Sequence, residues 1–171
     1  MSHKKKLIAG LIFGFIAAVA FDQWTKLLAV RHLMGQPPFV LWDGVFELLY
    51  SENRGAAFGL MEGRQGFFLF IALVVLAAVV FLVIRMPAET KYYPIHCIAM
   101  FVAAGAVGNM TDRLIRGYVV DFLYFKLIDF PIFNVADCYV TVSMAALLIF
   151  ILFIYKEEDF DFLQRKKEEE R

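Results

Sequence analysis

The chain has 171 residues, of which 61% are hydrophobic, and its 17 basic and 17 acidic side chains give a formal net charge of zero. Soluble domains are closer to half apolar, so this composition and the mean hydropathy of +0.66 indicate a membrane protein. A neutral chain offers no basic surface for nucleic acid, and we expect no such partner. The length predicts a single membrane-embedded domain, residues 1–171, whose crossings and loops carry out any chemistry.

Four long apolar segments predict transmembrane helices at 7–30, 67–85, 93–113 and 135–155. Each of the last three contains 18 consecutive uncharged residues, which is long enough for a helix to cross the bilayer core. The first follows three lysines, as a signal peptide would, but no small-x-small cleavage site leads into a soluble domain. The predicted fold class is an α-helical membrane protein with four transmembrane helices.

The connection between the first two predicted helices, residues 31–65, predicts a small extramembrane region that contains β-strands. Its apolar runs at 39–42 and 45–50 are too short to cross a membrane and are rich in aromatic and β-branched residues. We expect them to form a sheet on the bilayer surface. The next turn, 53–59, has small residues that let the backbone approach a ligand closely.

The distribution of Lys and Arg predicts the orientation. These residues concentrate in segments 4–6, 85–91 and 156–171, which share one side of the membrane if the chain crosses four times. By the positive-inside rule that side is cytoplasmic. We expect both termini in the cytoplasm, with the inner tail 156–171 as a solvated end and the 31–65 region on the outer face.

Four carboxylates are expected at one level of the bundle, near its outer face. Measured from the charged residues at the inner helix ends, a rise of 1.5 Å per residue places three of them at roughly 24, 31 and 28 Å, namely Asp22, Asp112 and Asp137. Asp121 lies in the connection between the last two helices. Four carboxylates at one level indicate a site.

Several of these acids have polar neighbours at helical spacing. Asp22 and Lys26 are spaced i,i+4, and Asn134 precedes Asp137 by three residues, so each pair shares a helix face. A further group with such spacing is Asn109, Asp112, Arg113 and Arg116. For the Asp22–Lys26 and Asp112–Arg113 pairs, an ion pair that braces a helix end explains the spacing as well as a site does.

Asp121 and Asp137 are the candidate catalytic pair, because each lies among apolar residues where an ionised side chain is costly unless it is paired or used. Two carboxylates held close together keep one proton between them. The ionised member can take a proton from water while the protonated one polarises a carbonyl, as in aspartic peptide hydrolysis. The three histidines are scattered, and no cluster has metal-ligand spacing. We therefore expect no metal and no cofactor.

The two cysteines, Cys97 and Cys138, are predicted near opposite ends of neighbouring helices. That separation is too large for a disulfide. We expect both to be free thiols.

Five stretches of the chain match one known family in their order: FDQWTK at 21–26, NRGAAF at 53–58, GAVGNMTDR at 105–113, VVDF at 119–122 and FNVAD at 133–137. With these stretches the chain resembles the bacterial lipoprotein signal peptidases, the signal peptidase II family, over nearly its whole length. Cys138 stands where the family leads us to expect serine. As the residue after Asp137 it points about 100° away on a helix, so we interpret it as a packing substitution.

The resemblance implies a membrane aspartic endopeptidase of the bacterial cytoplasmic membrane. Its substrates would be prolipoproteins that carry diacylglycerol on a cysteine, cut just before that cysteine, with Asp121 and Asp137 as the catalytic pair. Positions implied to shape or support the site are Asp22, Lys26, Asn53, Gly55, Asn109, Asp112, Arg113, Asn134 and Ala136. The resemblance also implies contact with membrane lipid and inhibition by cyclic peptides such as globomycin, and we expect a monomer.

Three other classes of protein remain as alternatives. A proton-coupled transporter also uses intramembrane acids, but it needs them at several depths. A structural subunit would use the polar cluster only to lock helix packing. A presenilin-type intramembrane protease is disfavoured because the acids lie near the surface and the chain has no Gly-x-Gly-Asp motif.

Overall fold

The computed structural model describes residues 3–55 and 64–163. The long helices are α1 (His3–His32), α2 (Gln65–Arg85), α3 (Tyr93–Arg116) and α4 (Val135–Phe153). One sheet contains β1 (Phe39–Trp42), β2 (Phe46–Asn53) and β3 (Val119–Tyr124). Short 3-10 helices are η2 (Thr90–Tyr92), η3 (Lys126–Ile128) and η4 (Glu157–Leu163). The predicted fold class, a helical membrane protein with a small β-containing region, is confirmed.

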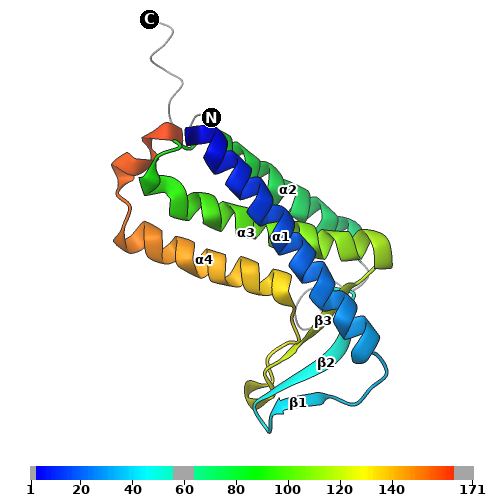
Figure 1. Cartoon of the computed structure of the whole chain (residues 1–171). Coiled ribbons are helices and arrows are strands. Elements are labelled where there is room, and N and C mark those ends of the chain that lie inside the picture. The colour runs from blue at the N-terminus through cyan, green and yellow to red at the C-terminus, as the bar shows by residue number, and fades with distance from the viewer. Residues whose placement is uncertain (1–2, 56–63, 164–171) are drawn as a thin grey trace, which may run out of the picture.

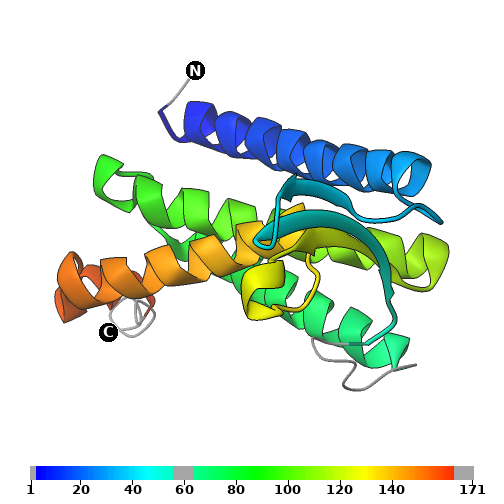
Figure 2. The same ribbon diagram turned by 90° about the horizontal axis from the view of Figure 1, so that it is seen from below.

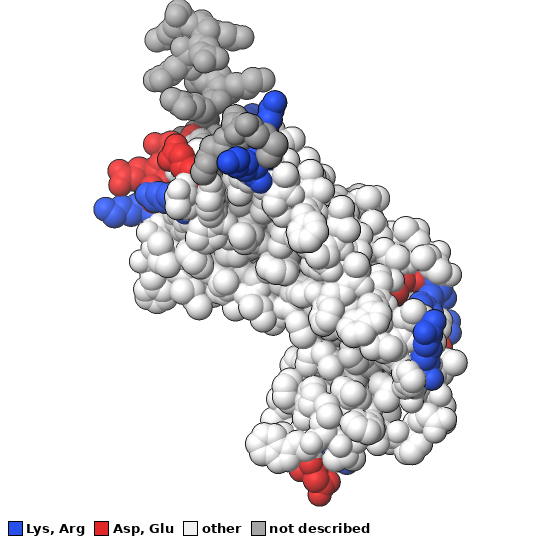
Figure 3. Space-filling view, viewed as in Figure 1, with Lys and Arg blue, Asp and Glu red and all other residues white. Residues whose placement is uncertain are grey.

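All four long helices are long and apolar enough to cross a membrane. On the face drawn in Figure 3, charged side chains gather toward the two ends of the molecule and leave an uncharged surface between them. Helix α2 shows the cause most clearly, because none of its residues is buried in the protein and many of its large apolar side chains are exposed. Such a surface is suited to the apolar core of a bilayer.

Helix α3 is the centre of the bundle, because α1, α2 and α4 all pack against it (Figures 1 and 2). Its approach to α4 is closest at Gly105, where an added Cβ atom would lie 2.6 Å from the carbonyl oxygen of Ala136. Only a residue without a side chain allows the two backbones to come this near. The buried residues Ala104 and Gly108 continue this small-residue stretch.

The sheet lies at the end of the bundle opposite the two termini (Figure 1). Its strands are antiparallel in the order β1-β2-β3, with Ser51 opposite Asp121 and Asn53 opposite Val119. The sequence predicted strands at β1 and β2 but left Asp121 in a connection, whereas the structure places this residue in β3. The first four residues of β3 are buried, so the strand forms part of the floor on which the site is built.

The inner tail differs from the solvated end that we expected. Phe160 and Phe162 of η4 pack against a buried cluster made of Met86, Tyr92, Ile95 and Tyr155. Asp159 accepts a hydrogen bond from the backbone N–H of Lys156 and forms an ion pair with Lys91. The described part of the tail therefore closes the terminal end of the bundle, while residues 164–171 lie outside the described residues.

Candidate active site

Asp121 and Asp137 come from different elements and are joined through one side chain, Asn134. Asp121 lies in β3 and Asp137 in the first turn of α4. The Asn134 amide donates to Oδ1 of Asp121 at 2.6 Å, and the Asn134 backbone N–H donates to Oδ2 of Asp137 at 3.1 Å. The two acids predicted as a pair are therefore bridged by a single residue.

The position of Asn134 follows from its role as the N-cap of α4. Its Oδ1 accepts a hydrogen bond from the backbone N–H of Asp137 at 3.1 Å, which completes a reciprocal capping box. The start of a helix carries partial positive charge, so it favours the ionised form of a carboxylate in the first turn. Helix formation itself therefore holds Asp137 in place.

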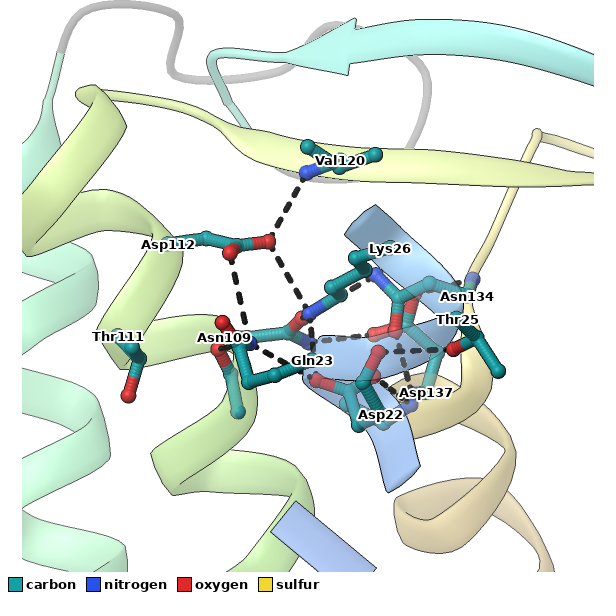
Figure 4. A network of polar contacts seen from close by, with 12 residues as sticks. Asp22, Gln23, Thr25, Lys26, Asn109, Thr111, Asp112, Val120, Asn134 and Asp137 are labelled. Atoms are coloured by element: carbon teal, nitrogen blue, oxygen red, sulfur yellow. Dashed lines mark hydrogen bonds and ion pairs between the residues drawn. The ribbon is translucent and has the colours of Figure 1, made fainter. Parts of the chain in front are cut away.

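Asn109 of α3 connects the pair to a buried lysine. Its Nδ2 donates to Oδ1 of Asp137 at 2.7 Å, and its Oδ1 accepts from Lys26 at 2.9 Å and from Asn134 at 3.1 Å. Figure 4 shows these side chains converging from α1, α3 and α4. Each oxygen of Asp137 thus has its own donor.

The second oxygen of Asp121 is held by Asn53, the last residue of β2. Asn53 donates from Nδ2 to Oδ2 of Asp121 at 2.9 Å and accepts from the backbone N–H of Gly55 at 3.0 Å. Arg113 donates to the carbonyl oxygen of Gly55 at 3.3 Å, and its guanidinium lies 4.8 Å from the ring centre of Phe68. Residues 56–59 of the predicted turn lie outside the described residues.

Lys26 lies between two buried acids, Asp22 at 2.9 Å and Asp112 at 3.2 Å, and all three side chains are at most 1% exposed. Both acids also accept backbone N–H groups. Oδ1 of Asp22 accepts from Ala136 at 2.9 Å, and Oδ2 of Asp112, the oxygen that faces Lys26, accepts from Val120 at 3.1 Å (Figure 4). The cluster therefore ties α1 and α3 to the two elements that carry Asp121 and Asp137.

This cluster decides two interpretations that the sequence left open. Asp22 and Lys26 do form the predicted pair, but neither forms a direct hydrogen bond with Asp137. Lys26 is linked to Asp137 through Asn109. Asp112 pairs with Lys26 and, at 3.6 Å, with Arg116. Arg113 instead points to Gly55, since successive residues of a helix point about 100° apart.

Two features of the site had weak signals in the sequence. Gln23 donates from Nε2 to Asp22 and to the carbonyl oxygen of Gly108, at 3.2 and 3.1 Å. The only sequence signal for Gln23 is its position inside the FDQWTK stretch. Gly108 matters because a Cβ atom there would lie 2.5 Å from Oδ2 of Asp22. Ala136, a predicted supporting position, is fully buried beside Gly108 and Asp22.

The surroundings of Asp121 favour its protonated form. Burial, followed by the negative charge of Asp137, raises the pKa of Asp121 from its ordinary value of 3.8 to about 7. The hydrogen bonds from Asn53 and Asn134 act in the opposite direction and lower this pKa. The pair can therefore hold one proton near neutral pH, with Asp121 as the site that carries it.

Other chemistries find less support among the described residues. No group of three His, Cys, Asp or Glu side chains there has the geometry to hold a metal ion. Cys97 and Cys138 are both free, as predicted. The arrangement that remains is a pair of carboxylates with fixed hydrogen-bond donors, which suits proton transfer to and from water.

The comparisons with known proteins show which family the chain belongs to. The family described as signal peptidase (SPase) II matches residues 14–153. The lipoprotein signal peptidase of Brevibacillus brevis is 45% identical over 80% of this chain and 92% of its own length. That of Caldanaerobacter subterraneus subsp. tengcongensis is 41% identical over 87% of this chain and 97% of its own.

Solved structures show the same architecture. One bacterial membrane enzyme, determined by the in meso method at 2.3 Å resolution, superposes with a TM-score of 0.73. It is 28% identical, and the match covers 96% of each chain. A second, determined at 1.9 Å, gives a TM-score of 0.74 with 30% identity over 86% of this chain and 96% of that one. The chain belongs to the signal peptidase II family of membrane peptidases.

Proposed function

We propose that the chain is an aspartic endopeptidase that removes the signal peptide from diacylglyceryl-modified prolipoproteins by cutting just before the lipidated cysteine. The observation that supports this most directly is the bridging of Asp121 and Asp137 by Asn134. A side chain that donates to one acid while its backbone donates to the other keeps two like charges close. The family relatives named lipoprotein signal peptidase supply the substrate class.

In the proposed reaction, Asp121 begins protonated and Asp137 ionised. Asp137 takes a proton from a water molecule while the water oxygen bonds to the scissile carbonyl carbon. At the same time Asp121 donates a hydrogen bond to the carbonyl oxygen. The tetrahedral intermediate collapses when the C–N bond breaks and the leaving nitrogen receives a proton from the pair. The products are a carboxylic acid and the free amine of the lipidated cysteine.

The hydrogen bonds around the pair support these roles. Asp137 accepts from Asn109 and from the N-terminus of α4, which favour its ionised form. Burial and the charge of Asp137 favour the protonated form of Asp121, raising its pKa to about 7. Asn53 and Asn134 each donate to one oxygen of Asp121, so the plane of its carboxyl group is fixed.

The proposed setting is the bacterial cytoplasmic membrane, with residues 1–171 acting as one peptidase domain and as a monomer. Both termini would lie in the cytoplasm, since the lysines of segment 4–6 begin α1 at the end away from the sheet. The pair would then lie near the outer face, where a lipid-anchored scissile bond can reach it. Cyclic peptides such as globomycin would inhibit by occupying this site.

The test is cleavage of a purified diacylglyceryl-modified prolipoprotein by wild type, Asp121→Asn and Asp137→Asn, with thermal unfolding recorded for each protein. We expect wild type to cut before the modified cysteine, and both variants to lose at least 1,000-fold in kcat/KM while remaining folded, as for other catalytic pairs. Folded wild type that leaves this substrate intact would overturn the proposal and favour the proton-coupled transporter, whose assay is proton uptake in liposomes.

A further inference from the structure

A cavity of about 180 Å³ lies between α1, α2 and α3, on the side of the bundle that leads to the chain termini. Its α1 wall runs from Ile8 to Phe15, α2 contributes Val79 and Val83, and α3 closes the floor with Met100 and His96. Phe15, the cavity residue on α1 nearest to Asp22, lies about 10 Å along the helix from it, so the cavity is separate from the active site. It is a second feature of the molecule, which the peptidase chemistry does not use.

The walls of the cavity suit hydrocarbon. His96 is its one polar residue, and its Nε2 lies 3.2 Å from the carbonyl oxygen of Pro87. A carbonyl oxygen only accepts, so Nε2 donates to it. The other ring nitrogen, Nδ1, is buried and has no hydrogen-bond partner among the described residues. The other lining residues are apolar, so the part of an occupant that lies against them is an apolar one, such as an acyl chain.

The end of α1 places positive charge on the same face as the cavity. At about 100° per residue, Lys4 lies within about 30° of the mean direction of the α1 cavity residues. Lys5 lies about 70° away and Lys6 about 170° away, on the opposite face. All three lysines are exposed, so Lys4 and Lys5 are available at the mouth of the cavity.

The length of the groove and the pairing of the other basic side chains at this end indicate what kind of molecule the groove binds. Lys4 to Phe15 spans about 16 Å, close to the half-thickness of a bilayer core of about 30 Å. The nearby Lys91 is already paired with Asp159, and Arg85 lies 5.2 Å from the ring centre of Phe81. Among the described residues at this end, neither Lys4 nor Lys5 forms an ion pair.

We propose that this groove binds one anionic phospholipid, with an acyl chain along Ile8–Phe15 and the phosphate at Lys4 and Lys5. The occupant is a lipid because the walls are apolar and the groove spans one leaflet. It is anionic because the cationic groups at the mouth lack a described counter-charge. This site is independent of the proposed cleavage reaction, so either proposal can fail without the other.

The experiment is native mass spectrometry of the full chain, delipidated in detergent and titrated with dioleoylphosphatidylglycerol or dioleoylphosphatidylcholine. We expect one tight site that prefers the anionic lipid about tenfold or more. Each lysine near an anionic headgroup contributes roughly fivefold, so Lys4→Gln should weaken phosphatidylglycerol binding by about that factor. The same change should weaken phosphatidylcholine binding less, because its choline ammonium offsets the charge of the phosphate.

Lys6→Gln is the matched control, because it removes the same charge from the opposite face of the same helix. It should leave the lipid preference unchanged. Val83→Phe fills the groove and should weaken both lipids, with thermal unfolding used to confirm that the variant folds. Equal affinity for the two lipids, or equal losses from Lys4→Gln and Lys6→Gln, would overturn the proposal in favour of non-selective lipid contact.

Discussion

The ammonium group of Lys26 lies 2.9 Å from Oδ1 of Asn109, and this contact fixes which end of the amide faces Asp137. A lysine can only donate, so the amide oxygen must point toward it and the amide nitrogen away from it. That nitrogen lies 2.7 Å from Oδ1 of Asp137. A buried ion cluster on α1 thus determines the hydrogen bonding of an acid on α4.

The same lysine should be essential for stability. Lys26→Met leaves Asp22 buried without its cation and Asp112 with only the longer contact to Arg116, and breaking such a cluster by removing one partner costs about 3–5 kcal/mol. Thermal unfolding in detergent should show a large fall in Tm. Arg54→Met is the control, because Arg54 pairs with Glu52 and neither side chain is buried, and it should change Tm far less. Equal effects of the two changes would contradict the structural role of Lys26.

Two substitutions of Asn134 should distinguish its role as the cap of α4 from its role in the active site. Asn134→Ser keeps an N-cap oxygen but removes the amide donor to Asp121, whereas Asn134→Ala removes both. Loss of the cap costs about 1 kcal/mol, so only the alanine variant should unfold at a clearly lower temperature. Both should lose on the order of 100-fold in kcat, because the acid is no longer held in place. A serine variant with full activity would show that the amide bridge is dispensable.

The sequence predicted the helices well because each is specified locally, by an uninterrupted apolar run such as 67–84. It also predicted that Asn134 lies beside Asp137, since a spacing of three residues settles that contact on a helix. Strand β3 was missed for the opposite reason. Its partner β2 is distant in the chain, and its six residues show no alternation of apolar and polar side chains.

The partners of the site acids were harder to predict than the acids themselves. Asp112 and Arg113 are neighbours in sequence, yet the structure sends Asp112 to Lys26 on α1 and Arg113 to Gly55 beyond β2. Both choices depend on how α3 is rotated against elements that are remote in the chain. The tail was misjudged in the same way, because Phe162 packs against Tyr92 of η2, which is remote in the chain.

Gly108 should tolerate no side chain. An alanine Cβ there would lie 2.5 Å from Oδ2 of Asp22, so the carboxylate must move away from Lys26 and from the backbone of Ala136. We expect Gly108→Ala to lower both Tm and kcat. Gly10→Ala is the matched control on α1, since nothing lies within 4 Å of its added Cβ. That change should be neutral or should stabilise the helix by up to about 1 kcal/mol. A Gly108→Ala variant as stable and active as the control would contradict the close approach.

The pH dependence of cleavage should report the ionisation of Asp121. Its pKa is raised to about 7 by burial and by Asp137. If protonated Asp121 donates to the scissile carbonyl while ionised Asp137 activates water, kcat/KM should fall about tenfold per pH unit above that pH, and it should fall again at low pH, where Asp137 becomes protonated.

Asn53→Ala should shift the pH above which kcat/KM falls, and in a defined direction. Asn53 donates to the Asp121 carboxylate and so lowers its pKa. Without that hydrogen bond the ionised form is less favourable, the pKa rises, and the fall in kcat/KM should begin at a higher pH. Tyr124→Phe is the control. It removes a hydroxyl at the end of β3 that donates to Asp129, so it should leave that pH unchanged. If kcat/KM of Asn53→Ala instead begins to fall at the same pH or at a lower one, the group that titrates there is not Asp121, because removing a donor from a carboxylate can only raise its pKa.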